Sequence, residues 1–214
     1  MFRLAIKICG LSTAETLHAA LDRGATHVGF IHFAKSPRHL DLTTLAGLAA
    51  RAPAHVGRVA VLVDPDDMLV EALVAAGGVS ALQLHGKETP QRAAEIASRS
   101  GLEIWKAVSV KHAGDIVSAA AYTGAVHRIL FDAKTPDGAA LPGGMGMRFD
   151  WGLLADYRGD LPWGLSGGLD ADNVAAAVKQ TGAPLVDVSS GVESAPGVKA
   201  VDKIAAFCKA VTQC

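Results

Sequence analysis

Features that would direct this chain to a membrane, to nucleic acid or out of the cell are missing. No apolar stretch in its 214 residues approaches the roughly 20 residues needed to span a bilayer. The opening segment MFRLAIKICG has neither the long apolar region nor the small-residue cleavage site of a secretory signal. The formal net charge is -1 and the basic residues are scattered, which excludes a basic surface for nucleic acid or anionic lipid. We therefore expect a cytoplasmic protein that binds a small molecule through local contacts.

Cysteine and the usual nucleotide-binding motifs are also scarce. The three cysteines, Cys9, Cys208 and Cys214, have neither metal-ligand nor redox spacing, and their odd number suits a reducing compartment better than a disulfide framework. No GxGxxG follows the first apolar run, and no GxxxxGK[ST] occurs anywhere. Each cysteine must therefore be interpreted from its own position in the chain.

Short apolar or β-branched runs alternate with longer Ala-rich segments along the whole chain. Half of the residues are hydrophobic and 19% are charged, as in a globular protein with many buried strands. The Ala-rich segments, such as TAETLHAALDRG and DADNVAAAVKQTG, have helical apolar spacing, and several begin with Ser, Thr or Asp and end on Gly. The apolar runs predict eight strands, at residues 4–9, 27–32, 59–64, 81–85, 103–108, 127–132, 162–166 and 184–189.

Eight strand–helix units in a chain of this length favour a closed barrel. The same alternation also suits an open doubly wound sheet, but the number of units and the missing nucleotide motifs favour closure. We predict a single-domain α/β protein over residues 1–214, a (β/α)8 or TIM barrel, with its chemistry in the loops that follow the strands. One such loop, KTPDGAALPGGMGMRFD at residues 134–150, is rich in Gly and has the composition of a mobile loop.

Polar residues within the strands indicate which face turns inward. Side chains alternate between the two faces of a strand, so the apolar positions of the first strand leave Lys7 and Cys9 on the inner face. The same reasoning turns Arg128, Asp187 and Lys106 inward. Because a dry interior does not tolerate unpaired charges, we predict that Lys7, Arg128 and Asp187 form a buried structural ion-pair network.

Three further polar side chains fall at strand ends, where the catalytic groups of such barrels collect. They are Cys9, Asp132 and His85. On position alone, Cys9 is equally interpretable as a small buried hydrophobic residue and Asp132 as a structural cap or ion-pair partner. An inward His85 beside Gln83 is also explained by a structural hydrogen bond. These residues are the candidates for function.

Two Gly-containing segments follow the last two predicted strands. LSGGLDADNV covers residues 165–174 and DVSSGVES covers residues 187–194. Glycine permits close backbone approach, and a helix N-terminus presents free N–H groups and a positive dipole end. Because the loops after strands 7 and 8 often bind phosphate in this fold, the pair predicts a phosphate site.

Seven motifs occur in order at the predicted strand ends and loops: KICG, GFIHFAKSPRHL, LQLHG, FDAK, GGMGMRFDW, LSGGLDADNV and DVSSGVES. Together they resemble phosphoribosylanthranilate isomerase of tryptophan biosynthesis, and the resemblance runs nearly end to end. It implies an Amadori rearrangement of N-(5-phosphoribosyl)anthranilate to 1-(2-carboxyphenylamino)-1-deoxyribulose 5-phosphate. It also implies that no cofactor and no metal take part.

By this resemblance Cys9 is the general base and Asp132 is the general acid. Asp132 would have to carry a proton in order to open the ribose ring. Cys9 would need electropositive help to be a thiolate near neutral pH, since the pKa of a free thiol is about 8.5. Arg38, in KSPRH, is implied to receive the anthranilate carboxylate, because a guanidinium fork matches a planar carboxylate better than an ammonium does.

The resemblance also implies where the rest of the substrate lies. The loop of residues 143–146 would close over the sugar. Met145 and Met147 depart from the polar residues usual in this loop, which argues against a hydroxyl contact there, and His32 replaces an apolar residue without a catalytic role. Backbone groups of residues 167, 168, 190 and 191 would hold the phosphate. The substrate-binding candidates are Arg38, His85, Gly143, Gly144, Gly167, Gly168, Asp187, Ser189, Ser190 and Gly191.

Two other functional classes remain open. One is another phosphate-binding barrel, either a lyase like indole-3-glycerol-phosphate synthase with a lysine-centred site, or a dual histidine/tryptophan isomerase with two aspartates. Cys9 at the end of strand 1 disfavours both. The other is a catalytically inactive binding barrel, which would more naturally have lost Cys9, Asp132 or Arg38, and all three are present. The sequence leaves open whether the protein is a monomer or a homodimer.

Overall fold

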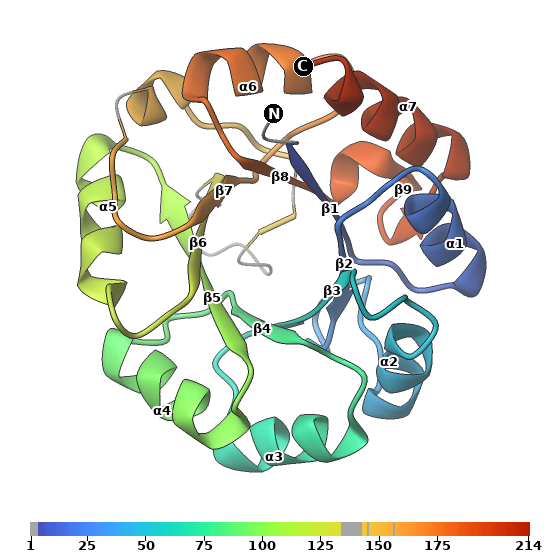
Figure 1. Ribbon diagram of the computed structural model, residues 1–214, viewed down its shortest axis with the longest axis vertical. Coiled ribbons are helices and arrows are strands. Elements are labelled where there is room, and N and C mark those ends of the chain that lie inside the picture. The colour runs from blue at the N-terminus through green and yellow to red at the C-terminus, as the bar shows by residue number, and fades with distance from the viewer. Residues whose placement is uncertain (1–3, 134–142, 145, 156) are drawn as a thin grey trace.

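Eight parallel strands close into a barrel in the computed structural model, which describes residues 4–133, 143–144, 146–155 and 157–214 (Figure 1). Each strand pairs with the next along the chain, and the first pairs with the eighth. The predicted TIM barrel is thus confirmed, and each predicted run overlaps a strand, although β3 begins two residues earlier than predicted and β5 ends two residues later. The barrel strands are β1 (Ala5–Cys9), β2 (His27–Ile31), β3 (Gly57–Leu62), β4 (Ala81–Leu84), β5 (Glu103–Val110), β6 (Arg128–Ala133), β7 (Trp163–Leu165) and β8 (Leu185–Val188).

Helices surround the barrel as an outer ring (Figure 1). Four of them begin where the side chain of Thr13, Asp41, Asp66 or Thr89 accepts a hydrogen bond from a backbone N–H of the first turn, as expected for N-cap residues. No helix in the described part of the chain is long and apolar enough to cross a membrane. The α-helices are α1 (Ala14–Asp22), α2 (Leu42–Ala49), α3 (Asp67–Ala76), α4 (Pro90–Ser100), α5 (Ala113–Ser118), α6 (Val174–Thr181) and α7 (Val201–Thr212).

Shorter elements fill several connections. There are 3-10 helices at η1 (Ala119–Tyr122), η2 (Trp151–Leu154) and η3 (Ser190–Val192). After β8 and η3 the chain forms a two-stranded antiparallel hairpin, β9 (Glu193–Ala195) and β10 (Val198–Lys199), which the sequence analysis did not predict. This hairpin lies at the carboxyl end of β8, so it adds a further element on the side of the barrel where the loops follow the strands.

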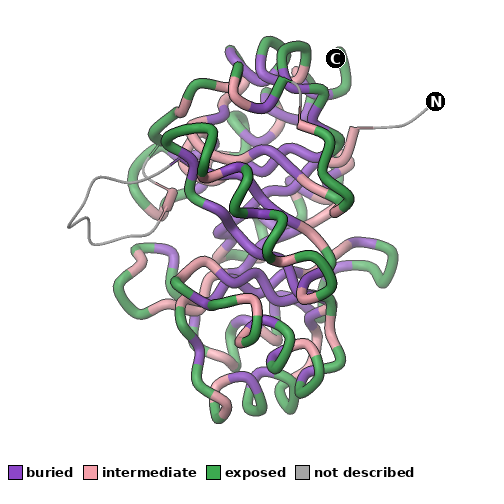
Figure 2. The backbone as a smooth tube through the Cα atoms, turned by 90° about the vertical axis from the view of Figure 1, so that its left-hand side faces the viewer, coloured by how far each residue is buried: buried purple, intermediate pink, exposed green. Residues whose placement is uncertain are grey.

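Apolar side chains pack in two places, as strand alternation requires. The larger cluster joins the outer faces of the strands to the helices, and Figure 2 shows the strands as mostly buried backbone at the centre of the molecule. The smaller cluster closes the barrel interior and consists of Val59, Ala81, Trp105, Leu130 and Leu185. The interior below the loops is therefore a packed core and not an open channel.

Two of the predicted inward charges have other environments. Lys106 alternates with the inward Trp105, so it faces the helix layer, where its Nζ lies 2.7 Å from a carboxylate oxygen of Glu88. Its prediction as an interior residue is wrong. Arg128 begins β6 and places its guanidinium carbon 4.9 Å from the Trp105 ring centroid, a cation–π contact that keeps it apart from the Lys7 ion pair. The prediction that Arg128 joins Lys7 and Asp187 in one ion-pair network is therefore wrong.

The ion pair between Lys7 and Asp187 is confirmed. The Lys7 Nζ donates to the two Asp187 carboxylate oxygens at 2.9 and 3.0 Å, and both side chains are buried. Burial lowers the pKa of Lys7, but the neighbouring Asp187 and Cys9 favour the ammonium and leave its pKa raised overall. Because β1 pairs with β8, this ion pair lies across the seam that closes the barrel.

Lys7→Met is expected to destabilise the fold by about 3–5 kcal/mol, since it leaves the Asp187 carboxylate buried without its cation. The free energy of unfolding measured in urea tests this. Lys111→Met, at an exposed lysine, is the control and should change stability by less than about 0.5 kcal/mol. A loss below about 1 kcal/mol for Lys7→Met would show that Asp187 accommodates protonation or solvent without the lysine.

Candidate active site

A pocket opens at the carboxyl end of the barrel, where the strand ends and their loops meet. Its polar lining comes from β1, β4, β6 and β8 and from the loops after β2, β6, β7 and β8. Apolar side chains of Ile31, Phe33, Val61, Val63 and Leu169 complete the wall. The pocket thus combines a few convergent polar groups with an apolar surface, which is typical of a site for a small aromatic or sugar ligand.

Cys9 is the last residue of β1 and is buried at the floor of this pocket. Gly29 of β2 lies directly beside it, because a β-carbon at that position would be 2.8 Å from the Cys9 sulfur. Burial raises the pKa of the Cys9 thiol, and Asp187 adds to the rise, whereas the cations Lys7 and Lys199 act in the opposite direction. In the free protein Cys9 is therefore a neutral thiol that a nearby positive charge would convert to thiolate.

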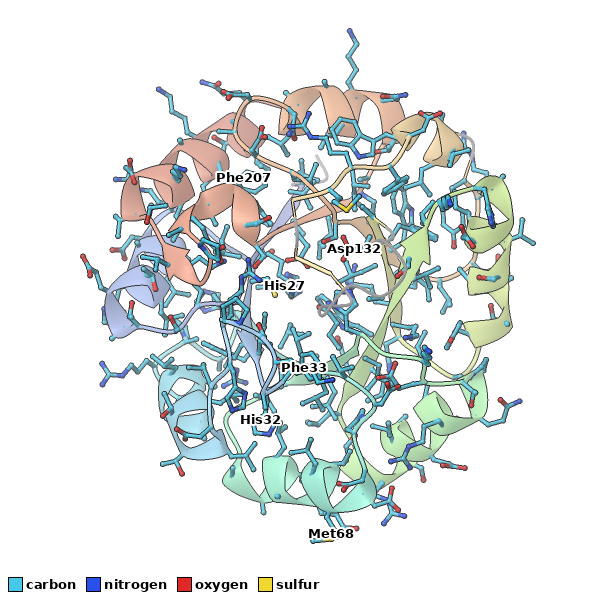
Figure 3. All side chains as sticks on the ribbon, turned by 180° about the vertical axis from the view of Figure 1, so that it is seen from behind. His27, His32, Phe33, Met68, Asp132 and Phe207 are labelled. Atoms are coloured by element: carbon cyan, nitrogen blue, oxygen red, sulfur yellow. The ribbon has the colours of Figure 1, made fainter. Side chains whose placement is uncertain are left out.

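Asp132, near the end of β6, lies inside the ring of strands (Figure 3). One carboxylate oxygen accepts the N–H of Ala133 at 2.9 Å, and the other lies 3.1 Å from the Nε2 of His85. The His85 contact lacks hydrogen-bond alignment. The structure therefore brings the predicted acid and the predicted histidine together at the mouth of the barrel, with one ring nitrogen of His85 unpaired within the described residues.

Gly143 closes over this pair from the loop after β6. A β-carbon at Gly143 would lie 2.5 Å from the second Asp132 oxygen and 2.7 Å from the His85 Nε2. Gly143→Ala is therefore expected to displace both side chains and to lower kcat about tenfold to hundredfold, since small misplacement of a reacting group is costly. Steady-state kinetics with a thermal unfolding curve check this. Gly114→Ala, whose β-carbon would meet only His112 at 3.5 Å, serves as control, and equal activity of the two variants would contradict the close packing.

Arg38 follows β2 and is held by partners that the sequence analysis missed. Its Nε and Nη2 donate to the two carboxylate oxygens of Glu193 at 2.6 and 2.8 Å, and Nη2 also donates to the Gly144 carbonyl at 3.1 Å. Arg38 and Glu193 are both buried. The Pro-Gly pair of ESAPGVK is a turn signal that would have indicated the hairpin carrying Glu193.

The loops after β7 and β8 present backbone amides to the pocket. Gly167 and Gly168 have φ angles of +89° and +65°, in the region that favours glycine. No described residue accepts a hydrogen bond from the N–H of Gly168, Ser190 or Gly191. Gly168 and Ser190 line the pocket, so their amides are accessible to a ligand there, whereas Gly191 does not line it. Helix α6 itself begins further along at Val174.

The pocket gathers nearly all of the predicted site residues. Gly191 is the exception, because its α-carbon packs against the Leu169 carbonyl and the residue does not line the cavity. Met147 lines the pocket. Met145 and residues 134–142 of the predicted mobile loop lie outside the described residues. His32 bonds the Leu40 carbonyl at 2.8 Å and is a structural residue. The predicted residues on the pocket wall are Cys9, Arg38, His85, Asp132, Gly143, Gly144, Gly167, Gly168, Asp187, Ser189 and Ser190.

The sequence profile of the N-(5'phosphoribosyl)anthranilate (PRA) isomerase family matches residues 6–210 of this chain. The chain belongs to the PRA isomerase family. An N-(5'-phosphoribosyl)anthranilate isomerase from Zymomonas mobilis subsp. pomaceae is 55% identical over 206 residues, which cover 96% of each chain. One from Parvibaculum lavamentivorans is 50% identical over 207 residues, again 96% of each. The family resemblance inferred from the motifs is confirmed.

Solved structures of PRA isomerases have the same barrel. The crystal structure from Thermotoga maritima superposes with a TM-score of 0.88 at 34% identity, covering 99% of this chain and 100% of that one. A PRA isomerase in complex with reduced 1-(o-carboxyphenylamino)-1-deoxyribulose 5-phosphate superposes with a TM-score of 0.85 at 32% identity, with the same coverage. The fold and the family therefore agree over nearly the whole chain.

Proposed function

We propose that this protein converts N-(5-phosphoribosyl)anthranilate to 1-(2-carboxyphenylamino)-1-deoxyribulose 5-phosphate in tryptophan biosynthesis, with Asp132 as acid and Cys9 as base. The observation that carries the proposal is the convergence of Cys9, Asp132 and Arg38, from three separate parts of the chain, on one pocket at the carboxyl end of the barrel. Membership of the PRA isomerase family supports it. The protein acts as one catalytic domain in the cytoplasm, as a monomer or homodimer.

Asp132 opens the ribose ring. Its carboxyl proton goes to the ring oxygen, the bond between that oxygen and C1 breaks, and the nitrogen lone pair forms an iminium at C1. The Asp132 carboxylate that remains lies 3.1 Å from the His85 Nε2, and the two side chains share one wall of the pocket. A turn of the His85 ring would align its Nε2–H with this carboxylate and stabilise the charge that the carboxylate gains.

Cys9 then removes the proton from C2. The electron pair of the C2–H bond becomes the C1=C2 double bond of an enolamine, and the iminium nitrogen takes up the electrons, so that its positive charge is neutralised. Tautomerisation gives the ketone. Because burial raises the pKa of the Cys9 thiol, the thiol first gives up its proton to solvent at the pocket mouth, and the positive charge of the iminium stabilises the thiolate that then takes the C2 proton.

The two anionic ends of the substrate are held apart by the site. Arg38 receives the anthranilate carboxylate through its remaining guanidinium donors, and the apolar wall around Phe33 accommodates the ring. The phosphate binds to the free backbone amides of Gly168 and Ser190 at the opposite loops. Fixing both ends leaves C1 and C2 between the acid and the base.

The direct test is the decay of anthranilate fluorescence when N-(5-phosphoribosyl)anthranilate, prepared in situ, is mixed with the purified protein. Rapid decay that scales with protein concentration supports the isomerase. Thermal stabilisation by the product analogue without turnover would identify an inactive binding barrel and overturn the proposal. Conversion of the histidine-pathway aminoaldose as well would indicate the dual isomerase.

A further inference from the structure

Glu193, the first residue of β9, is a carboxylate with every acceptor position occupied. One oxygen accepts from the Arg38 Nε at 2.6 Å and from the Lys199 Nζ at 2.7 Å. The other accepts from the Arg38 Nη2 at 2.8 Å and from the Gly197 N–H at 3.3 Å. A carboxylate saturated by four donors holds a bidentate guanidinium in one plane. Arg38 is therefore oriented before any ligand arrives.

The hydrogen bonds of Arg38 leave one end of its fork open. Three of its five N–H groups are taken, by the two oxygens of Glu193 and by the Gly144 carbonyl. Within the described part of the chain, the two N–H groups on Nη1 have no acceptor, and Nη1 lies 3.0 Å from where a β-carbon of Gly144 would be. Arg38 and Gly144 both line the active-site pocket.

Lys199 joins Arg38 and Glu193 in a buried cluster and changes its net charge. Its Nζ donates to Glu193 and to the carbonyl and hydroxyl oxygens of Ser189, at 2.7, 2.8 and 3.1 Å, which accounts for the three hydrogens of an ammonium. Arg38 with Glu193 alone would be a neutral pair and would attract an anion weakly. With Lys199 the three side chains carry one net positive charge in a buried setting, where charge interactions are strong.

The hairpin that carries Glu193 and Lys199 packs directly on the loop of Arg38. Gly197, at its turn, has a φ of +82°, and a β-carbon there would lie 2.6 Å from the Pro37 carbonyl. On the other side, a β-carbon at Gly10 would lie 2.7 Å from the Arg38 Cδ and 3.4 Å from the Lys199 Nζ. The cluster is thus enclosed between the hairpin and the residue that follows Cys9.

We propose that Glu193 and Lys199 are positioning residues: Glu193, held by Lys199, aims the Arg38 guanidinium at the substrate carboxylate, and Lys199 keeps the cluster positive. The inference rests on the proposed function, in which Arg38 binds that carboxylate. Neither side chain touches the reacting atoms. Their effect on recognition of the carboxylate is separate from the ring-opening step at Asp132, whereas the charge of Lys199 also favours the thiolate of Cys9.

The experiment compares two substrates, N-(5-phosphoribosyl)anthranilate and the aniline analogue made from aniline and ribose 5-phosphate, which lacks the carboxylate. For Glu193→Gln and for Lys199→Met, KM for the anthranilate substrate should rise about tenfold to hundredfold, the loss of one hydrogen bond to a charged group. The kcat of Glu193→Gln should change less than about threefold, whereas Lys199→Met also removes a cation that favours the Cys9 thiolate and should lower kcat equally for both substrates. KM for the aniline analogue should stay at the wild-type value. Lys199→Arg, which keeps the charge, should recover most of the loss.

Lys203→Met is the matched control, because the Lys203 Nζ also donates to Glu193, but to its backbone carbonyl at 2.7 Å. It should leave both KM values unchanged. An equal rise in KM for the two substrates in either variant, or a fall in kcat with both substrates in Glu193→Gln, would mean that Glu193 and Lys199 only hold the fold and would overturn the inference. If Glu193→Gln does not fold, Lys199→Met decides the question.

Arg38→Met separates the inference from the function on which it rests. It should abolish the preference for the carboxylated substrate. If Arg38→Met keeps that preference, the assignment of Arg38 itself fails, and with it the inference. If Arg38→Met loses the preference while Glu193→Gln and Lys199→Met keep it, the positioning role alone is wrong and the proposed function stands.

Discussion

Asp132→Asn should lower kcat about 100- to 10,000-fold, the usual contribution of a general acid, while the affinity for product changes little. The amide keeps the shape of the carboxyl group, and its oxygen can still accept the Ala133 N–H. It has no proton to give to the ring oxygen, so the ribose stays closed. Fluorescence decay under single-turnover conditions measures the chemical step, and product titration measures binding.

Asp160→Asn is the control, because Asp160 is an exposed residue away from the pocket lining. It should leave turnover unchanged. Turnover of Asp132→Asn near the wild-type rate would remove Asp132 from the acid step, and His85, 3.1 Å away, would be the next residue to substitute. A parallel loss of product affinity would instead indicate that Asp132 mainly binds the sugar.

Cys9→Ser should lower kcat by a similar factor, about 100- to 10,000-fold. A hydroxyl fills nearly the same buried space, but it holds its proton far more tightly than a thiol and cannot act as the base near neutral pH. The fold should survive, since the neighbouring Lys7–Asp187 ion pair is unchanged. Steady-state turnover and a thermal unfolding curve on the same preparation check the two halves of this expectation.

Cys214→Ser, at the exposed carboxyl end, is the matched control and should be fully active. If Cys9→Ser retains wild-type turnover, the protein remains an isomerase but its base is another group. Cys208→Ser does not serve as a control, because Cys208 is buried in the packing between α7 and the barrel and its substitution tests stability.

The positions of Cys9 and Asp132 were predictable from the strands that carry them. The alternation of side chains along a strand determines whether a residue faces the barrel interior, and a position at the end of the strand places it at the carboxyl end of the barrel. Counting strands also predicted closure of the barrel. Polarity was a poor guide in β5, where Lys106 faces outward to Glu88. Glu88 lies in the loop between β4 and α4, and no local sequence pattern connects it to Lys106. The prediction for Arg128 failed for another reason. It considered only charged partners, whereas the guanidinium lies over the aromatic ring of Trp105.

The side of the pocket around Arg38 was predicted least well. Arg38 was identified through motif resemblance, but its partner Glu193 is 155 residues away in the sequence and reaches it only through the fold. Such long-range pairs leave no periodic signal. The Pro-Gly turn is the only sequence signal for the short hairpin β9–β10. Its strands of three and two residues are too short to show an alternation of polar and apolar residues.

The pairing of Lys7 with Asp187 joins residues 180 positions apart, at the seam between the first and last strands. Cys9 and Lys7 are therefore synthesised long before the Asp187 carboxylate, the hairpin and Lys199 that complete their surroundings. A ribosome-bound chain that ends before residue 185 lacks β8, and its β1 has one edge unpaired. Enzyme activity should consequently appear only after residue 199 has been synthesised, and the exposed edge of β1 is open to unwanted strand pairing until β8 has formed.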